Sequence, residues 1–147
     1  MSSVDYSTTD APSHDDLAIV DEGLGAANEQ AAPLGEVRPL ACFARSEGRV
    51  IAGAIGRTWG PACELQQLWV APHRRRQGIA SRLVREFEAA AARRGCTSVF
   101  LETFSFQAPE LYLRLGYEVK HELTVYPHGV VRYTLLRELP AADPQAQ

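Results

Sequence analysis

The sequence predicts a single domain of mixed α/β (α+β) class, in which a central, mostly antiparallel sheet carries helices on both faces. Three β-rich runs separated by short turns, at Val37 to Arg45, Arg49 to Thr58 and Ala62 to Val70, predict an antiparallel meander. A helical pattern from Gln77 to Arg94 follows, and then a strand-like run from Ser98 to Thr103. Because a strand–helix–strand connection joins parallel neighbours, we expect the strands on either side of this helix to be parallel.

The start of the chain predicts a flexible end followed by a helix. The polar residues 1–12 indicate a flexible segment or a short edge strand. Ser13 can cap a helix, and an apolar pattern then runs from Asp15 to Gln30, which we expect to be helical. The predicted domain covers residues 13–139, and residues 140–147 are expected to form a tail.

The second half of the chain holds the strongest helical pattern. Gly95 follows two arginines and is a typical helix end. A short helix is expected at Pro109 to Leu115, and Tyr117 to Thr124 with Val130 to Leu136 predict a closing hairpin. The apolar face of the long helix is formed by residues at helical spacing: Ile79, Leu83, Val84, Phe87, Ala90 and Ala91.

Composition narrows the class of protein. The chain has 147 residues and a formal net charge of -3, which disfavours a nucleic-acid partner. Cys42, Cys63 and Cys96 match neither a disulfide framework nor a zinc-binding spacing, so we expect no metal site and interpret them as small buried residues. We find no signal-peptide pattern and no membrane-spanning apolar run, and we therefore expect a cytoplasmic protein with no membrane partner.

The most informative stretch is the turn that precedes the long helix. It runs from Arg75 to Ala80 and contains Gly78, between a strand-like run and the start of the helical pattern. A glycine at such a junction brings backbone N–H groups close to a ligand, and the helix directs its positive end the same way. The turn therefore predicts a site for a phosphorylated ligand.

Three elements of the sequence together resemble the GNAT superfamily of acetyl-CoA-dependent N-acetyltransferases. A strand ends in Leu68-Trp69-Val70, and an Arg-x-x-Gly-x-Ala turn follows it, with its glycine at Gly78. The motif Ala108-x-x-x-Tyr112-x-x-x-Gly116-Tyr117 comes later, in the expected order and spacing. The resemblance covers roughly Val37 to Leu139, and it implies a V-shaped splay between the two parallel central strands.

The resemblance implies acetyl-CoA as co-substrate and indicates how it is bound. In the family, the turn amides bind the pyrophosphate, the strand end pairs with the pantetheine arm, and the acetyl group lies in the splay. Arg76 replaces a glycine common in the family's turn, and we expect its φ to stay negative. Ser105 stands where many members have an asparagine, and it either contacts the cofactor or caps the short helix. The expected cofactor-binding residues are Leu68, Trp69, Val70, Arg75, Arg76, Gln77, Gly78, Ile79, Ala80, Ser81, Ser105 and Ala108.

The resemblance also implies the catalytic groups. Tyr112 stands at the family's general-acid position, and the backbone N–H of Val70 is the expected oxyanion donor. Glu64 lies at a strand position where members with a carboxylate base often carry it. An alkylamine is mostly charged at neutral pH, so such a base would take its proton. By alternation we expect Gln66 on the same face of the strand, where it could hold a water; a solvated strand glutamate is the other interpretation of Glu64.

Other side chains with reactive or aromatic groups are weaker candidates. We expect His73 to be an exposed loop residue, and His121 and His128 are expected at the surface or at the acceptor cleft. Phe104 and Phe106 flank the loop before the short helix, where they form either an apolar acceptor wall or core packing.

The predicted function is transfer of an acetyl group from acetyl-CoA to a primary amine by direct attack in a ternary complex. The slightly acidic chain favours a small cationic amine as acceptor. The alternatives are a protein or peptide N-acetyltransferase and a non-catalytic acyl-CoA-binding domain. A dinucleotide-binding domain would need a fuller glycine motif near the start of the chain. Family members often pair through sheet edges, which allows a homodimer.

Overall fold

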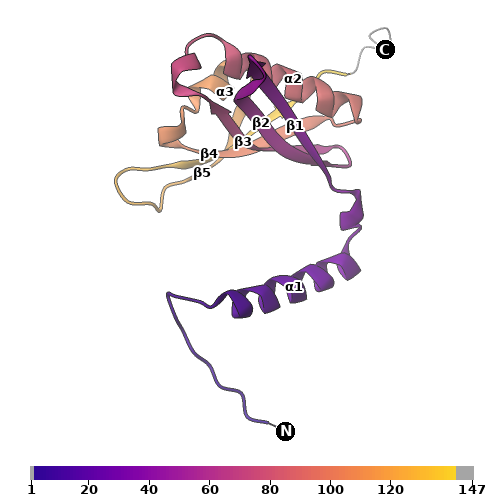
Figure 1. Ribbon diagram of the computed structural model, residues 1–147, viewed down its shortest axis with the longest axis vertical. Helices are drawn as coiled ribbons and strands as arrows, with labels where there is room; N and C mark the ends of the chain where they lie inside the picture. Colours follow the sequence, from indigo (N-terminus) through magenta and orange to yellow (C-terminus); the bar gives the residue numbers. More distant parts are fainter. Residues whose placement is uncertain (1, 142–147) are drawn as a thin grey trace. The chain divides into compact units, whose positions relative to one another are not determined.

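The computed structural model describes residues 2–141. Within that range the chain divides between Glu36 and Val37 into two units (Figure 1). Residues 142–147, most of the predicted tail, lie outside the described range.

The first unit contains one long helix, α1, which spans His14–Ala31. Ser13 is its N-cap, and the Ser13 hydroxyl accepts a hydrogen bond from the backbone N–H of Asp16 at 3.1 Å. The predicted helix is thus confirmed, whereas residues 2–12 form no edge strand. None of the residues of α1 is buried. A short 3₁₀ turn, η1 at Leu34–Glu36, follows.

The second unit is built on a six-stranded mixed sheet with the order β1-β2-β3-β4-β6-β5. Only the pair β3–β4 is parallel, and every other neighbouring pair is antiparallel. The meander and the parallel central pair predicted from the sequence are therefore confirmed. The strands are β1 Arg38–Ser46, β2 Arg49–Trp59, β3 Ala62–Val70, β4 Ser98–Phe104, β5 Glu118–Leu123 and β6 Arg132–Glu138.

The connections place two helices and two 3₁₀ turns around the central strands. The long helix α2 spans Ile79–Arg93 and starts after the predicted Gln77, because Gly78 has a left-handed backbone that cannot be helical. The short helix α3 spans Glu110–Arg114. The 3₁₀ turn η2, Pro72–Arg74, follows β3, and η3, Ser105–Gln107, follows β4.

The core of this unit lies between α2 and one face of the sheet. Leu83, Val84 and Phe87 on the predicted apolar face of α2 are buried, and α2 contacts β1, β2 and β3. Gly56 is needed for this close approach, because a Cβ there would collide with the backbone carbonyl of Glu64 and lie 2.9 Å from the Phe87 ring. None of the helices within residues 2–141 is long and apolar enough to cross a membrane.

Candidate active site

The two parallel central strands part along their length, which confirms the expected V-shaped splay. Their pairing ends where Glu64 lies opposite Phe100, although β3 continues to Val70 and β4 to Phe104. A cleft of about 330 Å³ opens beyond that point. It is lined by residues of both strands, of η3 and of α3: Leu65, Gln66, Gln67, Leu68, Trp69, Leu101, Glu102, Thr103, Gln107 and Tyr112.

A β-bulge accompanies the start of the splay. Gly56 of β2 lies opposite Leu65, but the preceding Ile55 lies opposite Gln67, so Gln66 is an extra residue on β3. An extra residue bends the strand that carries it. The bend follows Glu64 directly, at the place where β3 and β4 separate. The alternation of buried and unburied residues holds from Cys63 to Gln66 and is interrupted only at Gln67.

Tyr112 is a nearly buried tyrosine that lines the cleft. The residue lies on α3 and is 7% exposed. Its hydroxyl has no hydrogen-bond partner among residues 2–141, where every fully buried polar side-chain atom has one, so this oxygen is not fully buried. Burial raises the pKa of Tyr112 to about 12. The hydroxyl therefore stays protonated at neutral pH and can donate a hydrogen bond to a ligand.

The turn that leads into α2 is exposed and open to a ligand. Arg75, Arg76, Gln77 and Gly78 are all exposed. Gly78 is the N-cap of α2, with φ 77 and ψ 7, and a Cβ there would meet no atom within 4 Å. No side chain caps α2, so its first backbone N–H groups are left for an incoming group. Exposed amides at a helix N-terminus fit a phosphate.

The arginines of this turn are partly engaged with the protein itself. Arg74 donates a hydrogen bond to the Ser46 hydroxyl at 2.7 Å, and Arg75 donates through Nε to the Val70 carbonyl at 3.1 Å. Arg76 has φ 62, which corrects the expectation of a negative value. The turn requires a left-handed residue at this position, where a glycine would be free of strain and an arginine is not.

The end of β3 directs a backbone donor toward the cleft. The N–H of Ala71 donates to the Ile51 carbonyl on β2 at 2.7 Å. Successive residues of a strand direct their backbone groups to opposite sides. The N–H of Val70 therefore points away from β2, toward the side where β4 has separated.

Glu64 lies at the closed end of the splay, outside the set of residues that line the cleft. Its carboxylate accepts a hydrogen bond from Arg57 Nε at 2.9 Å, and the two side chains form an ion pair. Gln66 does line the cleft. The structure thus places Gln66 and Tyr112 in one cavity, and Glu64 beyond its end.

Ser105 and Ala108 lie in the segment that connects β4 to α3. The Ser105 hydroxyl accepts a hydrogen bond from the Val131 N–H at 3.0 Å, and the Ser105 N–H donates to the Val131 carbonyl at 2.8 Å. Ser105 does not cap the short helix, because Pro109 occupies the N-cap of α3. Ala108 has φ 56, an uncommon conformation for a residue with a side chain.

Sequence reasoning did not single out Glu102, which lines the cleft and forms an ion pair with Arg132. The alternation of residues along β4 could have indicated it, because it places Glu102 on the face opposite the buried Leu101 and Thr103. The Arg132 guanidinium also lies over the ring of Phe104, 6.0 Å from its centroid.

An aromatic cluster adjoins this side of the cleft. The rings of Phe104 and Phe106 are stacked, with centroids 5.3 Å apart and an interplanar angle of 6°. Tyr126, from the loop between β5 and β6, meets Phe104 edge-on, also at 5.3 Å. Phe106 is 70% exposed, so it is not a core residue.

The remaining candidates for a base or nucleophile do not line the cleft. His73, His121 and His128 are exposed. Burial raises the pKa of Cys63 to about 12, and it also raises the pKa of the other two cysteines. All three thiols therefore stay protonated at neutral pH. Residues 2–141 contain no cluster of three or more His, Cys, Asp or Glu side chains that could hold a metal ion.

A splayed parallel pair beside an open phosphate turn defines an acyltransferase of the GNAT type, and comparisons with known proteins agree. The family model described as "Acetyltransferase (GNAT) family" matches residues 9–117. The blasticidin-S acetyltransferase of Streptomyces morookaense is 34% identical over 112 residues, which is 73% of this chain and 82% of that protein.

Solved structures share the fold. A crystal structure of an acetyltransferase from Bacillus cereus ATCC 14579 superimposes with a TM-score of 0.73 at 23% identity, covering 90% of this chain and 98% of that one. The crystal structure of the ribosomal-protein-S18-alanine N-acetyltransferase from Escherichia coli superimposes with a TM-score of 0.64 at 22% identity, and 73% of each chain is covered.

The chain belongs to the GNAT family of acetyltransferases. It is accordingly an acyltransferase, and its co-substrate is acetyl-CoA.

Proposed function

We propose that this protein transfers the acetyl group of acetyl-CoA to a primary amine by direct attack, with both substrates held together in the cleft between β3 and β4. The observation that carries this proposal is the unpartnered hydroxyl of the buried Tyr112 in that cleft. Tyr112 and residues Leu65 to Trp69 of β3 line the same cleft, and the open turn at Gly78 follows β3 along the chain. The three features together fit a thioester whose phosphates lie on the turn.

The turn from Arg75 to Ser81 would bind the pyrophosphate. One helix N-terminus favours an anion by only about 0.3–2 kcal/mol, so several donors must act together. The backbone N–H groups of the exposed residues Arg76, Gln77 and Gly78 would supply them, and the exposed Arg76 adds a positive charge. The backbone of Leu68, Trp69 and Val70 at the end of β3 would pair with the pantetheine arm, with the Val70 N–H as a donor; the Val70 carbonyl already accepts a hydrogen bond from Arg75 Nε.

Three groups would serve the chemistry. The N–H of Val70 would donate to the oxyanion as the amine attacks the thioester carbonyl. Tyr112 would donate to the sulfur as the thiolate leaves, because its raised pKa keeps the proton on the tyrosine until charge develops there. Since the three cysteine thiols also stay protonated at neutral pH, direct attack by the amine is favoured over an acetylated enzyme.

The amine must lose a proton before it attacks, at a cost of roughly 4–5 kcal/mol for an alkylamine at neutral pH. We assign this proton to Glu64, through a water held by Gln66, because Glu64 lies just beyond the closed end of the cleft. Glu102 is a second carboxylate, on the cleft wall, and both carboxylates are ion-paired, Glu64 with Arg57 and Glu102 with Arg132.

The acceptor would be a small cationic amine. Glu102 lines the cleft, and the open face of Phe106 beside it offers an apolar surface that also attracts cations. The relative of 34% identity is by name an acetyltransferase of blasticidin S, which supports a small-molecule acceptor.

The test is a panel of acceptors incubated with acetyl-CoA, with free thiol as the readout. The panel contains blasticidin S, simple alkylamines, polyamines and peptides with free N-termini or lysines. We expect thiol release with one or more small amines and acetylation of that amine by mass spectrometry. Release only with peptides would overturn the small-molecule acceptor, and acetyl-CoA binding without release by any amine would overturn catalysis.

A further inference from the structure

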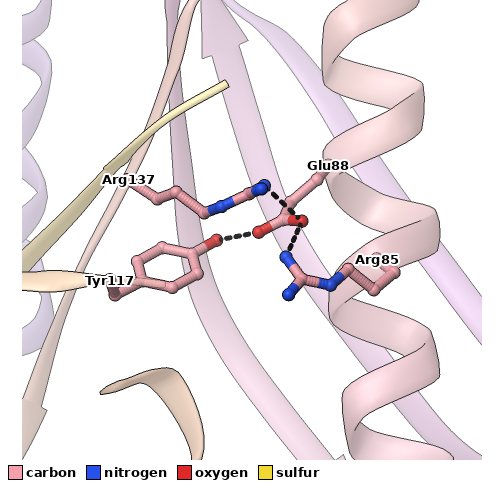
Figure 2. A network of polar contacts seen from close by, with 4 residues as sticks. All are labelled: Arg85, Glu88, Tyr117 and Arg137. Carbon is pink, nitrogen blue, oxygen red and sulfur yellow. Dashed lines mark hydrogen bonds and ion pairs between the residues drawn. The ribbon is translucent and has the colours of Figure 1, made fainter. Parts of the chain in front are cut away.

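A buried carboxylate that does not line the cleft is hydrogen-bonded on both of its oxygens. Glu88 of α2 has a side chain only 5% exposed. Its Oε1 accepts hydrogen bonds from Arg85 Nη1 and Arg137 Nη1, each at 2.9 Å, and its Oε2 accepts one from the Tyr117 hydroxyl at 2.8 Å (Figure 2). A carboxylate this deep in the protein is tolerated only when it is paired in this way.

The three donors come from different parts of the unit. Arg85 lies one turn before Glu88 on α2, Arg137 lies on β6, and Tyr117 follows α3. Figure 2 shows all three side chains converging on the one carboxylate. Glu88 therefore fixes the segment that follows α3, at Tyr117, against both α2 and the sheet.

Tyr117 connects this network to Tyr112. Their rings meet edge to face, with centroids 5.7 Å apart and an interplanar angle of 73°. The N–H of Tyr117 also donates to the carbonyl of Tyr112 at 3.0 Å. Between them, Gly116 has φ 97, and a Cβ there would lie 3.3 Å from Arg137 Nε. The segment that joins the two tyrosines is thus closely fitted against Arg137.

The two hydroxyls differ in what surrounds them. That of Tyr117 is held by Glu88, and that of Tyr112 has no hydrogen-bond partner among residues 2–141. Glu88 itself does not line the cleft. It can influence the reaction only through the residues that it holds in place.

We propose that Glu88 is a positioning residue for acetyl transfer: by holding the Tyr117 hydroxyl, it fixes the ring of Tyr112 so that the Tyr112 hydroxyl keeps its direction into the cleft. This inference rests on the role proposed for Tyr112. Arg85 and Arg137 orient the Glu88 carboxylate. All three partners are donors, so the network needs an acceptor on both oxygens.

The direct test is Glu88→Gln, which keeps the shape of the side chain but places an NH₂ group where one of the donors now meets an oxygen. We expect kcat to fall by about 10- to 100-fold, the scale of a small misplacement of a reacting group. The KM for acetyl-CoA should stay within about twofold, because Glu88 is remote from the turn that binds the phosphates. The matched control is Glu86→Gln on the same helix, whose carboxylate is 57% exposed and paired with Arg82; it should leave both constants unchanged.

A double-mutant cycle separates positioning from general damage to the fold. In a Tyr112→Phe background there is no hydroxyl to direct, so Glu88→Gln should cause little further loss of residual kcat. If Glu88→Gln does not fold, Tyr117→Phe replaces it, because that change keeps the ring and removes only the bond to Glu88. The proposal would be overturned if Glu88→Gln lowered kcat by the same factor in the wild-type and Tyr112→Phe backgrounds. It would also be overturned if Glu88→Gln and Tyr117→Phe both kept the wild-type kcat.

A second readout does not depend on activity. The ring-flip rate of Tyr112, measured by NMR with ¹³C-labelled tyrosine, should rise in Glu88→Gln and in Tyr117→Phe but not in Glu86→Gln. An unchanged rate in the first two variants contradicts the proposal even if the wild-type protein acetylates none of the amines tested. Absence of turnover in the wild type, with a raised flip rate in the variants, would instead count against the proposed function alone.

Discussion

The closed and open ends of the β3–β4 pair differ although the same two strands form both. At the closed end, Cys63 and Val99 lie side by side with no exposed surface, in the same core as the buried Phe87. At the open end the strands no longer pair, and Trp69 is 51% exposed beside the cleft. The bulge at Gln66 marks the change from one to the other.

This difference separates stability from function along the strand pair. The closed end is packed by small and apolar side chains, which hold the strands together. The open end leaves backbone donors and a tyrosine hydroxyl unpaired, which is costly in a fold without a ligand but useful for binding one. Substitutions at the open end should therefore change kinetics with little change in stability, and substitutions of the packed residues Cys63 and Val99 at the closed end should do the reverse.

The largest effect is expected from Tyr112→Phe at the open end. Removal of a general acid typically lowers kcat by about 10²–10⁴-fold. The free energy of unfolding should change little, because the Tyr112 hydroxyl has no partner among residues 2–141. Steady-state kinetics and urea unfolding of the same preparation check both statements. An unchanged kcat would remove Tyr112 from the mechanism.

Gly78→Asp should come next, with a loss of affinity for acetyl-CoA. Loss of one or two charge-assisted hydrogen bonds, at about 1.5–3 kcal/mol each, corresponds to at least a tenfold weaker Kd and can abolish detectable binding. Gly78→Asn is the matched control, because asparagine has nearly the same shape, tolerates φ 77 and carries no charge. Calorimetry should show much tighter binding to the Asn variant than to the Asp variant. Equal affinities for wild type and Gly78→Asp would refute the phosphate site.

The packing at the closed end can be tested by the pH dependence of the free energy of unfolding. The pKa of Cys63 is raised from 9.0 to about 12 by burial, so the folded state holds this proton more tightly than the unfolded state does. The resulting stability is fully present below pH 9 and is lost as the pH rises toward 12. Urea unfolding at pH 8 and pH 10 should show a loss of about 1 kcal/mol, and Cys63→Ala should lessen it. A pH-independent free energy over this range would contradict the assignment.

The smallest effect is expected from Glu64→Gln, which should flatten the acidic limb of the pH–rate profile. Arg57→Gln is the control, because it breaks the same ion pair and keeps the carboxylate. The exposed pair itself contributes only about 0–1 kcal/mol, so stability should barely change in either variant. An identical profile in Glu64→Gln, with a flattened one in Glu102→Gln, would move the role of the base to Glu102.

The strands and the glycine turn before α2 could be predicted from the sequence because their signals are local. Short turns between β-rich runs fix antiparallel neighbours, and Gly78 marks the entry to α2. The ion pair of Glu64 with Arg57 could not be predicted, because it depends on the register of β2 against β3. The bulge at Gln66 shifts that register, and the sequence carries no direct sign of it.

Nonlocal contacts also explain what else the sequence did not reveal. The bond from Tyr117 to Glu88 joins residues that are distant along the chain and meet only when α3 packs near α2. The positive φ of Arg76 follows from the path of the turn and not from its residue type. By contrast, the apolar face of α2 predicted which of its residues are buried. The apolar pattern of α1 correctly predicted a helix, but none of the residues of α1 is buried.

The most direct measurement is a titration of ¹⁵N-labelled protein with acetyl-CoA, followed through the backbone amide signals. If the turn holds the diphosphate and the thioester enters the splay, the amides of residues 75–81 and of Leu68 to Val70 should shift most and saturate together. Shifts confined to other parts of the unit, such as the β1–β2 hairpin, would contradict the assignment of both the phosphate site and the cleft.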